Sequence, residues 1–476
     1  MSRKIFTILA GQLQSKQAAI RYDISLYNPL FDGQTMASTS GKADMVNELE
    51  VYLKEEHYQE EISASVVIVD AMSFIRSHKI SSYQYSIFEK LADFLYTTLF
   101  RQAQGKVIHI VFDSYEERSL KEATRQSQTT QSSMQMSAIH ENTPTPLQMD
   151  KFWPSSQNKE SFQKYLRQHF TSLAIKNKHD IVLSGMLING KQVSAVSVSE
   201  GQSVPIDSLI SNIEEADQRL IKHIHWSSLT KKTKSFIVSS KDTDVLVLLL
   251  DYFKTLQRTG VQKIWHQIGS GEKKRAVPIH NLYQRIPKPL RRVILPCYIG
   301  TGCDYLSKIG TKLGAINAFP EKYLQDFGKT ELGPQQIALA EEYLVQVIKK
   351  DSNEKTFDDL RYSLYLKNLD LAGLPPTSHS VHGHIARWWF LVRKLRSLLD
   401  TTEFVLNPVN HGWIESDGHL LPEKNLKLVP ETMAKCCNCK TGNRTKKCTS
   451  KKCSCKKTNQ VCSPFCQCQS LCTNIG

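Results

Sequence analysis

Seven acidic residues lie where the sequence predicts strands to end or helices to begin: Asp70, Asp113, Glu215, Asp217, Asp242, Asp244 and Asp304. The carboxyl ends of parallel strands meet at one edge of an open sheet, so these side chains are expected to converge in space. Magnesium and manganese prefer oxygen ligands. Two such ions, about 3.5 to 4 Å apart, can position water, generate hydroxide and neutralise the leaving oxygen in phosphodiester cleavage. The pattern therefore predicts a site for two divalent cations.

Each acid alone also has a simpler explanation. An Asp that follows a strand is often a turn residue or a helix N-cap, which is how Asp244 would be interpreted by itself. Glu215 and Asp217 fit a solvated helix face favoured by the helix dipole, and Asp304 fits an ordinary loop acid. The order and context of all seven together favour the metal site.

The elements that would position these acids begin at residue 65, where short apolar runs alternate with segments of helical period. This alternation is typical of an α/β domain with a mostly parallel central sheet. The expected strands are 66–69, 107–112 and 236–239, and the expected helices are 86–100, 214–224 and 245–253, with further helical patterning at 290–318 and 385–399. A stretch rich in Gln, Ser, Thr and Met, 125–156, is predicted to be a mobile insertion.

The last 41 residues hold ten of the twelve cysteines. Nine of them form a series of Cys-x-Cys pairs and single cysteines: Cys437, Cys439, Cys448, Cys453, Cys455, Cys462, Cys466, Cys468 and Cys472. Zinc takes four ligands in a tetrahedron, so these nine use the whole pattern if they bind three zinc ions with three bridging thiolates. A disulfide-linked module and a metal-storage tail are the alternatives. The one-residue spacing within a pair suits chelation better than cross-linking.

The chain has 61 Lys and Arg residues against 46 Asp and Glu residues, a formal net charge of +15. Residues 434–476 contain nine basic residues and no acidic one. This balance favours a polyanionic partner, here DNA. Candidate phosphate contacts in the tail are Lys451, Lys452, Lys456 and Lys457. Such basic clusters also serve nuclear import, and the longest apolar run, 245–250, is too short to span a bilayer, so we expect a nuclear protein that is neither secreted nor in a membrane.

The cysteine series resembles the CXC domain of the tesmin type, whose nine cysteines follow the run C-x-C, C, C-x-C, C, C-x-C, C. In that family the domain binds three zinc ions and docks on DNA, which the resemblance implies here. The chain departs from the family in a longer gap between Cys439 and Cys448, in Lys452 where an aromatic residue is often found, and in the additional Cys436. These departures concern the preferred DNA sequence more than the zinc.

The acidic series resembles the PIN-like nuclease fold of the flap endonuclease and XPG type. The matching steps are IVDAM, IVFDS, EEAD, SKDTD and GTGCDYLSKIGTKLGA, within residues 65–319. The resemblance implies a three-layer PIN-like body, acids that hold two magnesium or manganese ions, and a helix-three-turn-helix motif in which Gly310 and Lys312 hold a duplex backbone. It also calls for basic residues after Asp113 that hold the cleaved phosphate; the candidates are Arg118, Lys121 and Arg125. Together with the CXC tail, the chain is similar to a group of mobile-element-associated animal proteins.

The sequence thus predicts five segments. They are an N-terminal segment without assigned chemistry (1–64), a nuclease body (65–320) that includes the insertion 125–156 and the helix-three-turn-helix motif 300–320, a helical extension (321–406), a polar linker (407–433) and a zinc domain (434–476). The aromatic and basic run 387–393 is predicted to be a half-buried helix rather than a platform for base stacking.

The favoured function is a divalent-metal-dependent, structure-specific DNA endonuclease tethered by its zinc tail. The alternative is a DNA-binding protein that kept the fold without the catalysis. The sequence contains no nucleophile motif that would indicate a Ser-His or Cys-His hydrolase. Cys303 is expected to be a buried residue that packs in the core. No small-molecule cofactor is expected, and the sequence carries no signal for an oligomeric state.

Overall fold

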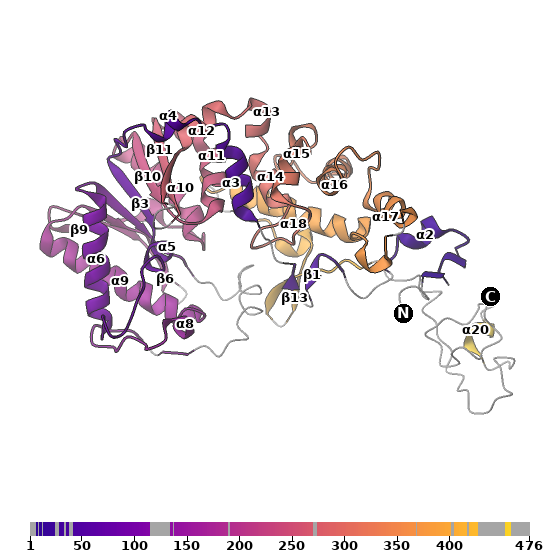
Figure 1. The fold of residues 1–476 in the computed structure, drawn as a ribbon. Helices are drawn as coiled ribbons and strands as arrows, with labels where there is room; N and C mark the ends of the chain where they lie inside the picture. The colour runs from indigo at the N-terminus through magenta and orange to yellow at the C-terminus, as the bar shows by residue number, and fades with distance from the viewer. Residues whose placement is uncertain are drawn as a thin grey trace.

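The computed structural model describes residues 6–7, 9–11, 13–23, 28–32, 35–37, 41–114, 134–136, 138–188, 191–269, 274–367, 369–400, 404–416, 418–426 and 453–457. In this part of the chain, an eight-stranded sheet with helices on both faces continues into a helical extension (Figure 1). None of the described helices is both long and apolar enough to cross a bilayer.

The central sheet has the strand order β12-β11-β10-β3-β4-β5-β8-β9. Its strands are β3 (Val66–Asp70), β4 (Val107–Val111), β5 (Ile181–Leu183), β8 (Ala195–Ser199), β9 (Gln202–Ile206), β10 (Ser235–Ser239), β11 (Lys263–Ile268) and β12 (Arg275–Pro278). The five strands from β11 to β5 are parallel, and the outer strands pair antiparallel. The predicted α/β class with a mostly parallel sheet is confirmed, and the three predicted strands form its centre.

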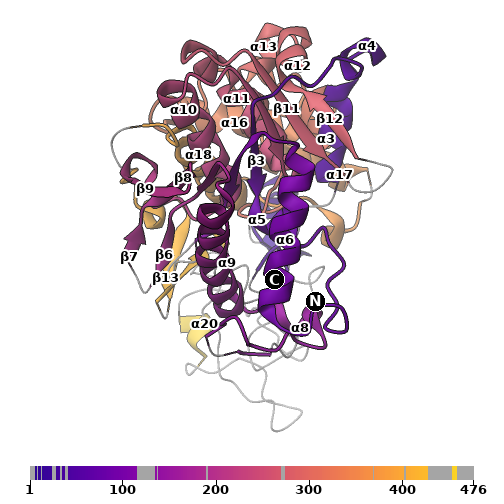
Figure 2. The same ribbon diagram turned by 90° about the vertical axis from the view of Figure 1, so that its left-hand side faces the viewer.

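Long helices cover both faces of the sheet: α10 (Ala216–Thr230) and α11 (Thr243–Arg258) on one face, α6 (Phe88–Ala103) and α9 (Ser156–Asn177) on the other (Figure 2). Strand β3 shows the division. Val66 and Ile68 belong to the core under α10 and α11, whereas Val67 and Val69 belong to the core under α6 and α9. A strand that is covered on both faces is apolar at every position, which is why this run could be recognised in the sequence.

The predicted mobile insertion is wrong for its second half. Residues 138–156, which include α8 (Met149–Phe152), pack on the core. Phe152 is fully buried, with ring centroids 5.8 Å from Phe88 and 6.2 Å from Phe162. The backbone N–H of Phe88 donates to the carbonyl of Thr143 at 3.0 Å. A few large apolar side chains thus anchor a stretch of polar composition; residues 115–133 lie outside the described part.

A helical region follows β12, the last strand of the central sheet, and begins earlier than the predicted extension 321–406. Its helices are α12 (Ile279–Arg285), α13 (Lys288–Arg291), α14 (Ile294–Gly300), α15 (Lys312–Asn317), α16 (Pro334–Ile348), α17 (Phe357–Leu366) and α18 (Ser378–Arg396). Trp388 on α18 is fully buried, and its indole N–H donates to the carbonyl of Pro296 at 2.9 Å. Trp389 is also buried. The run 387–393 is therefore a buried helix, more deeply covered than predicted, and offers no surface for stacking bases.

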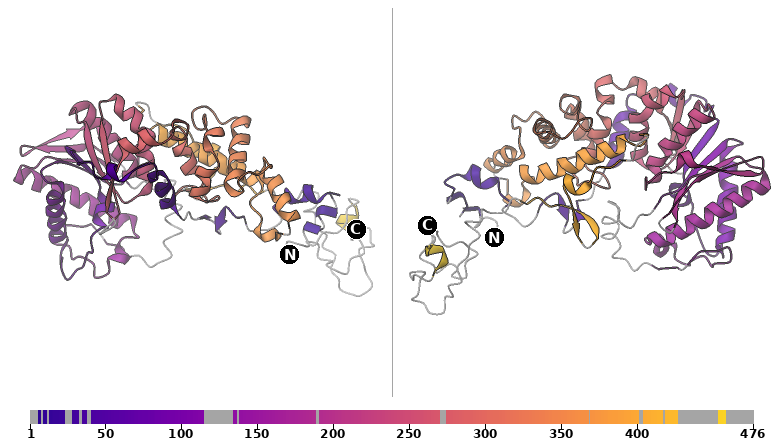
Figure 3. Two further views of the ribbon diagram at one scale, coloured as in Figure 1. Left: turned by 45° about the horizontal axis from the view of Figure 1, so that its top comes forward. Right: turned by 180° about the vertical axis from the view of Figure 1, so that it is seen from behind.

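The predicted polar linker is wrong for residues 407–426. In the described residues of this segment, η5 (Pro408–His411) leads into a hairpin of β13 (Trp413–Ser416) and β14 (His419–Pro422). Trp413 is fully buried, and the buried Arg387 guanidinium donates to the carbonyls of Gly412 and Glu423 at 2.8 and 2.9 Å. The right-hand view of Figure 3 shows the hairpin against α18. One tryptophan and one arginine therefore fasten a polar segment to the body.

The N-terminal segment also packs on the body. Helix α3 (Lys42–Glu50) buries Met45, Val46 and Leu49 in the main core and contacts α11 and α15. The remaining elements are α2 (Lys16–Ile20), β1 (Phe31–Asp32), β2 (Thr35–Met36), α4 (Glu55–Tyr58), α5 (Ala71–Ile75), β6 (Met186–Ile188), β7 (Lys191–Val193), η1 (Asp207–Leu209), η3 (Pro320–Lys322), η4 (Leu371–Gly373) and α20 (Ser454–Lys457).

Candidate active site

The neighbouring strands β3 and β10 each lead to an acid at the carboxyl end: Asp70 ends β3, and Asp242 follows β10. Asp70 ends β3 and caps α5, with its Oδ1 accepting the backbone N–H of Ser73 at 2.9 Å. Its Oδ2 accepts the hydroxyl of Ser240 at 3.2 Å, and that hydroxyl oxygen accepts the N–H of Asp242 at 3.2 Å. Ser240 therefore ties Asp70 to the start of the helix that follows β10.

Asp113 brings the EEAD step to the same edge. It follows β4, and its Oδ1 accepts the N–H of Ala216, the first residue of α10, at 2.9 Å. The N-cap residue Glu215 forms no cap bond with its own side chain. Asp113 therefore supplies the cap from the neighbouring strand, which places Glu215 and Asp217 beside the strand ends.

Helix α11 carries the next pair. Its N-cap is Asp242, whose side chain accepts the N–H of Asp244 at 3.2 Å, so the simpler interpretation of Asp244 as the cap is wrong by two residues. Asp244 lies in the first turn and accepts the phenol of Tyr298. The Lys42 ammonium lies 3.7 Å from Asp244 Oδ2 and 2.5 Å from Asp304 Oδ1. The lysine of α3 thus joins the last acid to the cluster.

Burial and mutual repulsion shift the pKa values of three acids in the cluster: Asp70, Asp217 and Asp244. Burial, with repulsion from Asp113, raises the pKa of Asp70 to about 7. Burial, with repulsion from Asp242, raises the pKa of Asp244 to about 7. The pKa of Asp217 is raised well above its usual range by burial and by Asp70, Asp242, Glu215 and Asp244. The structure therefore brings all seven acids to one edge of the sheet, within electrostatic reach of one another.

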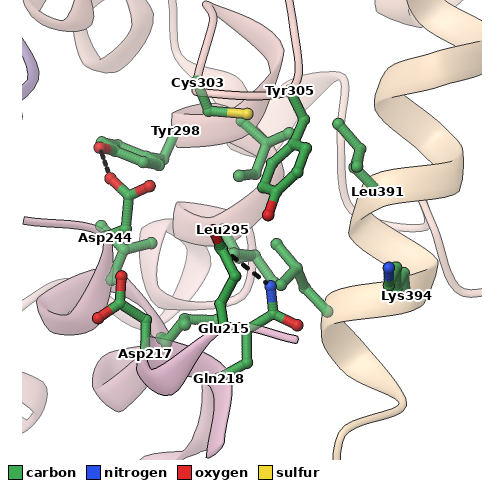
Figure 4. A pocket seen from close by; sticks show the side chains of 14 residues that line it. Glu215, Asp217, Gln218, Asp244, Leu295, Tyr298, Cys303, Tyr305, Leu391 and Lys394 are labelled. Carbon is green, nitrogen blue, oxygen red and sulfur yellow. Dashed lines mark hydrogen bonds between the residues drawn. The ribbon is translucent and has the colours of Figure 1, made fainter. Parts of the chain in front are cut away.

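A small pocket of about 30 Å³ opens beside the acids. Figure 4 shows Glu215, Asp217 and Asp244 on one side of it and Leu391 and Lys394 of α18 on the other. The rest of the wall is mostly apolar or aromatic and includes Leu295, Tyr298, Cys303 and Tyr305. Cys303 is buried, as expected, and burial raises the pKa of its thiol to about 12, which disfavours the thiolate form.

The donor set fits divalent cations in one specific respect. Asp217 Oδ1 is shut off from solvent and has no hydrogen-bond partner. A buried carboxylate oxygen without a donor is costly, and a bound cation would satisfy it. Within the described residues, no three His, Cys, Asp or Glu side chains are arranged to hold a metal ion as they stand.

Three residues that support the acids were not predicted from the sequence: Lys42, Tyr298 and Arg219. The buried guanidinium of Arg219 donates to the carbonyls of Phe112 and Gly185 at 2.8 and 2.6 Å, which fixes the end of β4. Burial lowers the pKa of Arg219 to about 10. The sequence around Arg219 carries no clear signal, since its neighbours at helical spacing include Glu215, Lys222 and His223. Lys42 also has no local signal, because the contact that reveals its role is with residues about 200 positions further along the chain.

The turn between α14 and α15 departs from the prediction. Lys312 is 2% exposed, and its ammonium donates to the carbonyls of Tyr298 and Gly302. Burial lowers the pKa of Lys312 to about 8. The predicted phosphate contact by Lys312 is therefore wrong, and this lysine holds the turn together. The amide of Lys308 is also engaged inside the chain, where it donates to Ala37 at 3.1 Å.

Gly310 has a structural requirement in this turn that gives a testable prediction. Its φ is +64°, and a Cβ there would lie 2.5 Å from Val347 Cγ1. Gly310→Ala should lower the free energy of unfolding by about 2 to 4 kcal/mol, since left-handed strain of about 1 to 2 kcal/mol is added to a clash. Gly105→Ala is the matched control, because Gly105 has φ +78° and open space around it. Equal losses for the two variants in urea unfolding would contradict the close contact.

Most of the predicted tail site lies outside the described residues, as do Arg118, Lys121 and Arg125. Of the nine predicted zinc ligands, Cys453 and Cys455 are described, and both are buried: Cys453 directly precedes α20 and Cys455 lies within it. Lys456 and Lys457 are exposed on this short helix. The positions of these four residues do not test the predicted zinc and phosphate contacts, which stay predictions.

Comparisons with known proteins add no relative. Neither the models of protein families nor the curated proteins contain a match to this chain. The function is therefore argued from the chain's own residues and geometry.

Proposed function

We propose that this chain is a divalent-metal-dependent nuclease of the PIN-like, flap-endonuclease type that cleaves branched or looped DNA. The observation that supports it most strongly is the acidic cluster at the carboxyl edge of a parallel sheet. Acids from β3, β4, α10, α11 and the α14–α15 turn meet there, although Asp70 and Asp304 are far apart in the sequence. A stable fold has no need of so much like charge in one place, so a cationic ligand is the physical reason to keep it.

The residues would divide the work as follows. Asp70, Asp113, Glu215, Asp217, Asp242, Asp244 and Asp304 would hold two magnesium or manganese ions. When bound, such a pair supplies an activated water and neutralises charge on the leaving oxygen. Ser240 and Arg219 keep the strand ends in place. The pocket next to Asp217 excludes water on its apolar side, which strengthens electrostatic interactions there.

The tail would deliver the body to DNA. A zinc-loaded CXC module with three zinc ions on Cys437 to Cys472 would present basic residues to phosphates, so affinity should fall steeply with salt. A nuclear location is part of the same proposal, since a DNA substrate and a basic tail both favour it.

The test is a cleavage assay with the full-length protein. Flap, bubble and single-stranded DNA are incubated with magnesium or manganese, and Asp242→Asn is the matched control because it removes one charge and keeps a side chain able to cap α11. We expect cleavage of the flap or bubble by the natural sequence and none above background by the variant. Equal products from the two proteins would assign the cleavage to a contaminant.

Two observations favour the second candidate, a DNA-binding protein without catalysis. The Lys42 ammonium already lies against Asp244 and Asp304, and the amide of Lys308 is used inside the chain. Binding of the same DNAs that weakens from 50 to 200 mM salt, without cleavage in either metal, would support this candidate.

A further inference from the structure

The lysine at the start of α3 occupies a position that the nuclease proposal does not explain. Lys42 reaches from the N-terminal segment into the acidic cluster, where its ammonium lies 2.5 Å from Asp304 Oδ1 and 3.7 Å from Asp244 Oδ2. Its side chain is 23% exposed, against 40% for Asp304. It is thus a cation held between two of the carboxylates expected to bind metal.

The position of Lys42 is fixed by its surroundings. Helix α3, of which it is the first residue, is anchored by Met45, Val46 and Leu49 in the main core. Just before the helix, the carbonyl of Ala37 accepts the amide of Lys308 at 3.1 Å, which ties the segment to the α14–α15 turn that carries Asp304. A surface lysine without such anchors would sample many rotamers and contribute little.

We infer that Lys42 acts as a cation built into the chain: it holds Asp244 and Asp304 together and competes with a divalent ion for these two carboxylates. The inference deepens the proposed function and rests on it, since it assumes that the acids bind divalent ions. Two positive charges cannot share the same pair of carboxylates at close range without strong repulsion. A metal that binds to Asp244 and Asp304 must therefore displace the ammonium.

The consequence is a site whose two cation positions differ. The position near Asp217 has a carboxylate oxygen without a hydrogen-bond partner and is open to a metal. The position between Asp244 and Asp304 is occupied by the Lys42 ammonium. A metal ion would bind there only at a higher metal concentration, or when substrate draws the ammonium away. Lys42 is a positioning residue in this scheme, and the scheme assigns the N-terminal segment a role that its sequence alone did not indicate.

The test is manganese binding by isothermal titration calorimetry, without DNA, on the full-length chain purified with zinc so that the thiolates keep their preferred metal. Lys42→Met removes the charge and keeps the length of the side chain. Lys54→Met, an exposed lysine of the same segment, is the matched control for net charge. We expect Lys42→Met to bind manganese at least about tenfold more tightly at the weaker position, and Lys54→Met to match the natural sequence.

The outcomes separate the inference from the function. If the natural sequence binds manganese and Lys42→Met binds it equally or more weakly, competition by Lys42 is excluded while the nuclease proposal stands. If neither protein binds more manganese than Asp217→Asn, both fail together. Lys42→Gln is the second variant, since it keeps a polar side chain at the helix start should Lys42→Met be unstable. Its manganese affinity must rise as well.

Discussion

Asp217→Asn should abolish DNA cleavage and at the same time stabilise the metal-free protein. Asp217 has one oxygen that is buried and lacks a donor, and its pKa is raised by burial and by four neighbouring acids. At pH 8 this carboxyl is ionised in the unfolded chain, whereas in the folded, metal-free chain burial and the neighbouring acids disfavour its ionised form, so the natural side chain lowers the free energy of unfolding. The variant should therefore raise the free energy of unfolding by on the order of 1 to 3 kcal/mol and lower the cleavage rate by at least about 10²-fold.

Urea unfolding with a chelator for divalent ions, at pH 8, together with the flap assay, measures both effects. Asp150→Asn is the matched control, because Asp150 is exposed in the first turn of α8 and is not one of the seven acids. It should change neither quantity appreciably. A loss of stability in Asp217→Asn would mean that this carboxylate contributes to folding by itself, which would remove the main argument for a cation next to it.

Manganese affinity should rise by up to several hundredfold between pH 5.5 and 7.5, because two carboxyls with a pKa of about 7 each contribute about 25-fold over this range. Burial raises the pKa of both Asp70 and Asp244 to about 7, whereas in the unfolded chain Asp titrates near 3.9. Between about pH 4 and 7 the folded chain therefore binds more protons than the unfolded chain, so metal-free stability should fall as the pH rises. A divalent ion must displace these protons, so each adds up to about tenfold in affinity per pH unit.

Calorimetry in two buffers of different ionisation enthalpy counts the protons released. We expect about one to two protons at pH 6 and close to none at pH 8.5, where both carboxyls are already ionised. The tail contributes no change if its zinc stays bound, which a zinc-sensitive dye reports. An affinity that is constant from pH 5.5 to 7.5 would show that Asp70 and Asp244 do not take part in binding.

The centre of the sheet could be predicted from the sequence, and its margins could not. Strands β3, β4 and β10 are covered on both faces, so each is mostly apolar in sequence, although His109 interrupts β4 and serines begin and end β10. The outer strands β8 and β9 have the sequences AVSVS and QSVPI, in which serines and a proline resemble loop composition. Their place depends on the pairing of β8 with β5 and of β9 with β8, which is a tertiary effect.

The acids of the site could be found for a related reason, whereas the direction of single basic side chains could not. Topology alone sends the residue after a parallel strand to the carboxyl edge, as for Asp70 and Asp113. Lys312 had the expected spacing, yet its ammonium lies 3.8 Å from the ring centroid of Tyr298, inside the turn. Lys42 approaches Asp244 from about 200 positions earlier in the chain, and no local pattern encodes that contact.

The hairpin that Trp413 and Arg387 fasten to α18 sets how far the cysteine-rich tail can travel. With residues up to 426 held on the body, only 11 steps separate it from Cys437, a fully extended reach of about 35 to 40 Å. A flexible linker from residue 407 to Cys437, not attached to the body, would span more than twice that distance. If the tail binds a DNA duplex as proposed, that duplex would stay within a few helical turns of the body. Cuts should then cluster close to the bound stretch rather than scatter along the DNA.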